Sequence, residues 1–184
     1  MKNNIYVKLY KILIIFLIIY LWSCSNESVS EDCENKSEKI IKYYNNEEYE
    51  NISDMFFLSS ELSKEEIAIY RKYTIIILFF FRKKYGKILE KELSNINNEY
   101  YNISFSIMEL SFWDTKPYGY QINYKVKYEK LGSGILSITY YNNNNLFYIK
   151  YITFGLLKSE KNLMITKNIW NEYLLILKNI EKNK

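Results

Sequence analysis

The sequence contains no histidine among its 184 residues. Histidine is the side chain that most often acts as general base and as metal ligand near neutral pH. Its absence excludes Ser-His-Asp and Cys-His catalytic sites and most zinc sites. Chemistry that needs only carboxylates is not excluded by this absence.

Glycine and proline are also scarce, with five residues and one residue respectively. No G-x-x-x-x-G-K-[ST], G-x-G-x-x-G, G-x-S-x-G or C-x-x-C pattern is present. Loops that cradle phosphate groups depend on glycine, so a nucleotide site is not expected. The sequence therefore predicts no cofactor, no metal ion and no catalytic residue, and hence a protein that is not an enzyme.

The longest unbroken apolar run, Ile12–Trp22, has eleven residues and follows three lysines near the start of the chain. A helix of that length spans roughly 16 Å, whereas a bilayer core needs about 20 residues. A basic start and a short apolar core are typical of a secretory signal. The alternative is an uncleaved anchor, with Val7–Trp22 as a short membrane helix.

The apolar run ends in Leu21-Trp22-Ser23-Cys24, which resembles the lipobox of bacterial lipoproteins. Leucine lies three residues before the cysteine and a small residue directly before it, while Trp22 departs from the pattern. The resemblance implies that the signal peptide 1–23 is removed and that Cys24 is lipidated and anchors the protein to a membrane outside the cytoplasm. By the same analogy, Ser25 favours the outer membrane if the bacterium has two membranes. Cys33 is then the one other cysteine, so no disulfide framework is expected.

The charges of the processed chain nearly balance. Loss of residues 1–23 removes three lysines and leaves 22 basic against 21 acidic residues. The lysines are scattered among glutamates, which is typical of a solvated surface. A nucleic-acid partner would need a clustered basic face, so none is expected.

Residues 24–36 contain almost no apolar side chains and are predicted to form a flexible tether. Residues 37–184 suit a single domain. Helical spacing is present over 37–45 and 47–57, and Ser63-Lys64-Glu65-Glu66 is a capping box that begins a further helix. This helix contains the run IIILFFF, which is apolar all round. Gly86 ends or kinks it, and Ile88–Leu93 is predicted to continue it.

Beyond residue 102 the apolar period changes to two, which predicts strands. Four strands are expected, near 102–112, 118–130, 135–141 and 146–154, with a bulge at Met108-Glu109. In the second strand one face carries tyrosines and the other is charged, as in an antiparallel sheet with one buried face. A helix over Lys167–Glu181, with Thr166 as its N-cap, belongs to a helical extension over 157–184.

Helices followed by a four-stranded antiparallel meander predict the α+β class. The order of these elements, with the segments RKKYGKILEKEL and YQINYKVKYEK, resembles the cystatin-like or NTF2-like roll over residues 37–155. The resemblance implies a curved sheet that wraps a long helix. Such folds carry enzymes, binding modules and partner domains alike, so the fold does not decide the function.

The loop Phe112–Tyr118 contains the single proline and the most distinctive side chains. Trp113, Tyr118 and Tyr120 would line a pocket mouth with Asp114 as a polar anchor, which is how many ligand sites are built. The alternative is an ordinary connection in which the tryptophan covers the end of the sheet. Two adjacent carboxylate pairs, Glu47-Glu48 and Glu65-Glu66, are explained by helix capping.

Three functions remain open. The first is a lipid-anchored envelope lipoprotein that binds a protein partner or a small ligand without catalysis. The second is an enzyme that uses the concave pocket of the roll. The third is an inhibitor or immunity-type protein, with the helix over 167–181 as its contact surface.

Overall fold

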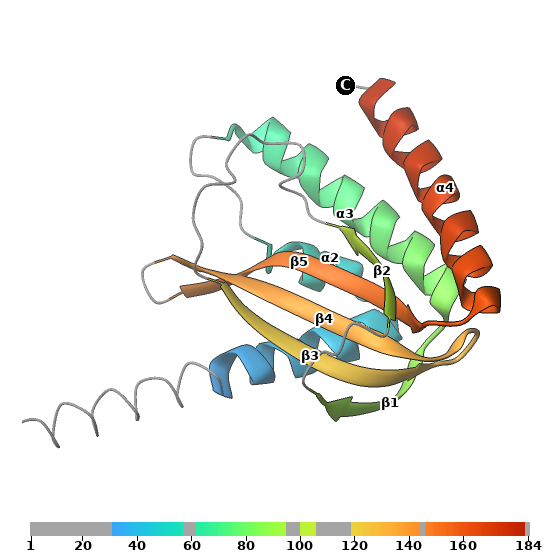
Figure 1. The fold of residues 1–184 in the computed structure, drawn as a ribbon. Helices are drawn as coiled ribbons and strands as arrows, with labels where there is room; N and C mark the ends of the chain where they lie inside the picture. The colour runs from blue at the N-terminus through green and yellow to red at the C-terminus, as the bar shows by residue number, and fades with distance from the viewer. Residues whose placement is uncertain (1–30, 57–61, 95–99, 106–118, 144–145, 183–184) are drawn as a thin grey trace, which may run out of the picture. The chain divides into compact units, whose positions relative to one another are not determined.

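The computed structural model describes residues 31–56, 62–94, 100–105, 119–143 and 146–182 (Figure 1). The chain divides into two compact units, Met1–Lys36 and Ser37–Lys184. The predicted signal peptide, Cys24 and the start of the tether lie outside the described residues. Residues 31–36 are helical, unlike the flexible tether that the sequence predicted. Lys36 pairs with Asp32 one turn earlier at 2.9 Å, and such pairs favour a helix.

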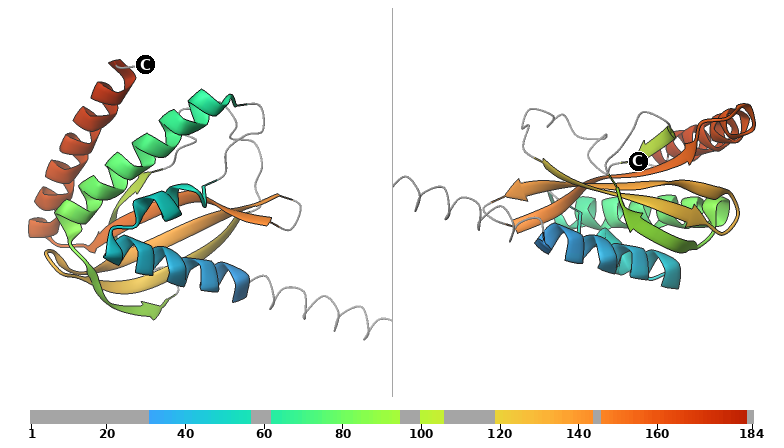
Figure 2. Two further views of the ribbon diagram at one scale, coloured as in Figure 1. Left: turned by 180° about the vertical axis from the view of Figure 1, so that it is seen from behind. Right: turned by 60° about the horizontal axis from the view of Figure 1, so that its bottom comes forward.

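The second unit has the α+β class that the sequence predicted. A helix over 37–46 is followed by α2 (Tyr49–Ser53) and the long α3 (Lys64–Tyr85). These three segments lie on one face of the sheet, and α4 (Glu160–Lys182) packs beside α3 near one edge (Figures 1 and 2).

The predicted capping box begins α3. The Ser63 hydroxyl accepts a hydrogen bond from Glu66 N–H at 3.2 Å, and the Glu66 carboxylate accepts one from Ser63 N–H at 2.8 Å. The cap satisfies two backbone N–H groups that a helix start leaves unpaired.

The sheet has five antiparallel strands in the order β1-β3-β4-β5-β2. Their bounds are Ile88–Leu93 for β1, Tyr100–Phe105 for β2, Gly119–Tyr128 for β3, Gly132–Asn143 for β4 and Leu146–Leu157 for β5. The three strands β3 to β5 confirm the second to fourth predicted strands. The predicted bulge at Met108-Glu109 lies outside the described residues.

The continuous four-stranded meander is not confirmed. Only β3, β4 and β5 follow one another as neighbours, because β2 pairs with β5 at the opposite edge from β1. Alternation of apolar residues shows that a segment is a strand, but it does not show which strand lies beside it.

The predicted helix over Ile88–Leu93 is wrong, because this segment is β1. Gly86 ends α3 with φ of 78°, a conformation that favours glycine. Asn45 then accepts a hydrogen bond from Ile88 N–H and donates one to the Ile88 carbonyl, both at 2.8 Å. Pairing of Ile88 with Tyr128 draws the segment into the sheet.

The C-terminal helix begins earlier than predicted, at Glu160. The Ser159 hydroxyl accepts a hydrogen bond from Asn162 N–H at 3.1 Å, as an N-cap does. Thr166 therefore lies inside the helix, where it is buried.

Aromatic rings fill the space between α3 and the sheet. Phe81 stacks on Phe154 with ring centres 4.7 Å apart, and Tyr85 meets the edge of Tyr128 at 4.8 Å. The Tyr128 hydroxyl donates a hydrogen bond to the Ile135 carbonyl at 2.6 Å. The tyrosine face of β3, with buried Tyr124 and Tyr128, therefore belongs to the core.

Candidate functional site

The ligand group predicted from the loop is not assembled within the described residues. Trp113, Asp114 and Tyr118 lie outside them. Tyr120 lies on β3, is 36% exposed, and its ring meets the edge of Phe147 with centres 5.4 Å apart. At this position Tyr120 covers Phe147 near the end of the sheet.

The adjacent carboxylate pairs make structural contacts. Glu66 belongs to the capping box, and Glu48 accepts hydrogen bonds from the side chains of Asn46 and Asn51. Glu47 has φ of 64°, which is uncommon outside glycine, where the helix over 37–46 gives way to α2. Helix capping is therefore confirmed for Glu66, whereas the side chain of Glu48 makes no capping hydrogen bond to α2.

Glu47 reaches an arginine at the end of α3. Arg82 is almost fully buried, and its guanidinium lies 3.5 Å from the carboxylates of both Glu47 and Glu129. A hydrogen bond from Lys87 N–H is the main cause that lowers the pKa of Glu129, and Arg82 adds to it. Arg82 therefore links the loop before α2, the end of α3 and the end of β3.

Three tyrosine hydroxyls lie near this arginine. The hydroxyls of Tyr44, Tyr49 and Tyr85 are buried and have no hydrogen-bond partner in the described part of the chain. Burial raises the pKa of Tyr49 to about 12, and burial also raises the pKa values of Tyr44 and Tyr85. These hydroxyls stay protonated at neutral pH, so the cluster is not poised for acid–base chemistry there.

A second candidate is the outward side of α3, where apolar side chains remain in contact with solvent. Ile69 is 40% exposed, Ile76 is 37% exposed and Phe79 is 56% exposed. Among the described residues, the side of α3 that faces the sheet and part of the side that faces α4 are covered. A helix that is apolar all round is normally buried on every side, so this bare side is unusual.

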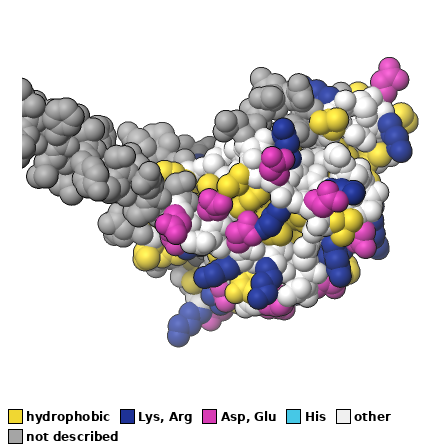
Figure 3. Space-filling view, turned by 90° about the horizontal axis from the view of Figure 1, so that it is seen from below, with side chains coloured by type: hydrophobic (Ala, Val, Ile, Leu, Met, Phe, Trp, Pro, Cys, Tyr) yellow, Lys and Arg dark blue, Asp and Glu magenta, His cyan; other side chains and the backbone are white. Residues whose placement is uncertain are grey.

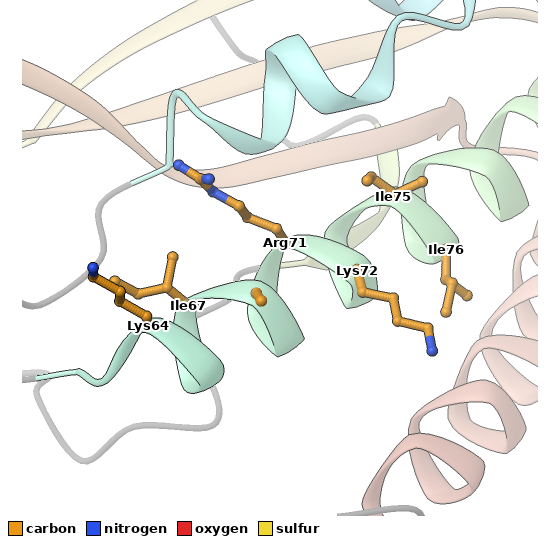
Figure 4. A pocket seen from close by; sticks show the side chains of 7 residues that line it. Lys64, Ile67, Arg71, Lys72, Ile75 and Ile76 are labelled. Atoms are coloured by element: carbon orange, nitrogen blue, oxygen red, sulfur yellow. The ribbon is translucent and has the colours of Figure 1, made fainter.

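Two of these side chains, Ile69 and Ile76, border hollows in the surface. One, of about 420 Å³, lies between α3 and α4 and is called the groove here. Its apolar lining residues are Ile69, Tyr73, Ile76, Ile176 and Ile180. The other, of about 500 Å³, lies along the neighbouring side of α3 and shares Lys72 and Ile76 with the groove (Figure 4).

The charged residues that line the two hollows are Lys64, Arg71 and Lys72. Arg71 and Lys72 point to opposite sides of α3 (Figure 4). Arg71 pairs with Asp54 at 3.0 Å, whereas Lys64 and Lys72 form no ion pair with any described residue. The groove is therefore apolar, with Lys72 as the charged residue at its border.

This pattern differs from another face of the molecule. Seen from below, acidic and basic side chains alternate, and no large area of one sign is present among the described side chains (Figure 3). The alternation there fits the solvated surface that the scattered lysines predicted.

The run IIILFFF, which is apolar all round, is the sequence feature that points to this surface. Its place beside α4 depends on contacts with Tyr173 and Glu172, which are far away in sequence. Helical spacing alone could not show which side stays bare.

No cluster of three or more metal-binding side chains is present among the described residues. In the same part of the chain, no helix combines the length and the apolar character that crossing a bilayer requires. The sequence matches no family model, no curated protein and no solved structure.

Proposed function

We propose that this chain is a non-enzymatic binding protein that receives a protein partner on the exposed face of α3 and α4. The observation that carries the proposal is the bare apolar side of α3, with Ile69, Ile76 and Phe79 in contact with solvent. Contiguous exposed apolar side chains with a polar border are typical of a protein interaction site. A blocking protein of the inhibitor or immunity type would use the same kind of surface.

The packing of the interior supports binding rather than catalysis in a concave pocket. The hollow between the helices and the sheet, lined by residues that include Leu78, Leu136 and Phe154, has a volume of only about 10 Å³. Ligand pockets are typically about 300–1,000 Å³. The hollows of that size described above lie outside the roll, along α3.

A second proposal concerns the type of α+β fold. We propose that the sheet and α3 form a roll of the cystatin-like or NTF2-like kind. The support is the long helix α3 across one face of an antiparallel sheet, with Phe81 stacked on Phe154.

The location follows from the lipobox resemblance. We propose that residues 1–23 are a signal peptide and that Cys24 carries lipid outside the cytoplasm, with the outer membrane favoured by Ser25 in a bacterium with two membranes. Two or three acyl chains, at about 0.8 kcal/mol per buried CH₂, anchor a protein firmly.

Native mass spectrometry of the full chain from its own cells tests both the binding function and the lipid anchor. We expect a second protein in a stoichiometric complex and a mass at Cys24 that includes acyl chains. A bound small molecule instead would support the pocket function, and a chain that is unprocessed and carries no lipid would contradict the anchor. In the variant Cys24→Ser, we expect the protein to leave the membrane fraction.

A further inference from the structure

The groove between α3 and α4 is a wedge that widens toward the start of α3. The two helices run antiparallel and touch at Phe80 and Tyr173, whose ring centres are 6.5 Å apart, and at the ion pair of Lys84 with Glu172. From this contact they diverge toward the C-terminal end of α4 (Figure 1). The wedge has an apolar floor.

From this shape and charge, we infer that the groove binds an amphipathic α-helix of another protein, with acidic residues beside its apolar stripe. An incoming helix would insert apolar side chains spaced three and four residues apart, as in other helix-in-groove complexes. Its carboxylates would meet Lys72, which lines the groove and forms no ion pair with any described residue. This inference rests on the proposed binding function and specifies the partner.

The observations favour such a helix over a second copy of the chain. In a twofold dimer the same patch meets itself. Lys72 would then approach a basic border of the same sign, which is unfavourable. A helix with acidic borders brings opposite charges together instead.

A membrane surface and an extended peptide fit the groove less well. The apolar floor at Tyr73 and Ile180 lies in a hollow between two helices, which the flat surface of a bilayer would not fill. An extended peptide would need the free edge of a sheet for its backbone hydrogen bonds. Both walls of the groove are helices, so they offer no such edge.

Site-specific photocrosslinking in the native cells tests the inference with the full chain. A benzophenone amino acid replaces Ile69 in the groove and, as a matched control, Lys125 on the exposed face of β3. The crosslinked peptides are then sequenced by mass spectrometry. We expect a peptide from another protein, joined at residue 69 and not at 125, whose sequence has helical apolar spacing and net negative charge.

Two further variants report on charge in the same assay. Lys72→Glu should lower the yield of the crosslink at residue 69 by about tenfold, because repulsion replaces attraction at the border of the interface. Lys72→Arg keeps the charge and should keep the yield. Lys72 is exposed, so neither change is expected to unfold the chain.

The remaining outcomes separate the inference from the proposed function. A crosslink to another copy of α3 or α4, to lipid, or to a basic or extended peptide would overturn the inference. A protein adduct at 125 without one at 69 would also overturn it, while a binding function on another surface would stand. No adduct at either position would contradict both.

Discussion

The two ends of α3 both carry large apolar side chains, but the surroundings of these side chains differ. At the packed end, Ile77–Tyr85, Phe81 and Tyr85 are fully buried against Phe154 and Tyr128. At the bare end, Lys64–Ile76, Ile69 and Ile76 keep more than a third of their surface exposed. One helix therefore supplies both the centre of the core and the surface proposed to bind a partner.

The comparison shows that the apolar content of a segment does not by itself predict whether its side chains are buried. Burial of a large side chain contributes stability because it removes apolar surface from water. Phe79 contributes little of this, although it lies only two residues before Phe81. If the exposed apolar side chains of α3 are kept for a partner, their substitution should affect binding, whereas substitution of the buried ones should affect folding.

The largest expected effect is at the packed end. Phe81→Ala should lower the free energy of unfolding by about 3–5 kcal/mol, because it leaves a cavity beneath Phe154. The matched change Phe79→Ala should alter it by less than about 0.5 kcal/mol, because that ring is exposed. Urea denaturation of the purified chains measures both values. Equal losses for the two variants would contradict the comparison.

The next effect concerns Arg82, which links the packed end to Glu47 and Glu129. Arg82→Ala removes two ion pairs and the packing of the buried stem, and should cost about 2 kcal/mol. Arg82→Met keeps most of the stem and should cost about half as much, since the two carboxylates are partly exposed and remain solvated. If the two variants lose the same stability in urea, packing of the stem plays no part.

The sequence predicted the centre of the fold better than its edges. Strand β3 has one buried and one wet face, as with Tyr124 and Lys125, so its period of two is clear. The segment of β1 consists of good helix formers with a single buried residue, Ile88. Its strand state depends on Asn45 and Tyr128, which are distant in sequence, so local patterns predicted a helix there.

The site was harder to predict than the fold. The loop that holds Trp113 and Asp114 was selected for its composition and lies outside the described residues. The groove depends on the angle between α3 and α4, which contacts such as Lys84 with Glu172 determine. A single sequence carries no direct signal for that angle, so only the unusual apolar run pointed toward the surface.

A smaller effect is expected at the start of the bare end. Ser63→Ala removes the cap of α3 and should lower the local stability of the first turns by about 1 kcal/mol, as measured by amide hydrogen exchange. Ser63→Asp keeps an acceptor and serves as control. Loss of protection at the packed end as well would show that the two ends unfold together.

The capping box at Ser63 and Glu66 should make the stability of the first turns of α3 depend on pH. Hydrogen bonds from Ser63 lower the pKa of Glu66 below its ordinary value of 4.5. A carboxyl whose pKa is lowered by folding stabilises the native state above the unfolded pKa and loses this contribution as the pH falls. Exchange protection of the first turns of α3 should therefore decrease below about pH 4.5, and Glu66→Gln should remove that decrease. A decrease of the same size in Glu66→Gln would assign it to other carboxyls.

The smallest effect on stability is expected in the groove, where Ile76 borders both hollows. Ile76→Gln should change the free energy of unfolding by no more than about 0.5 kcal/mol, because the side chain is partly exposed and a glutamine is easily solvated there. It should nevertheless abolish most of the fluorescence of an anilinonaphthalene sulfonate dye, whose apolar rings and negative charge match the groove and Lys72. Leu146→Gln, which changes an exposed leucine at the start of β5, should leave the dye signal unchanged. Equal loss of signal in both variants would mean that the dye reports exposed apolar residues in general, and the groove would then lose its distinction from the rest of the surface.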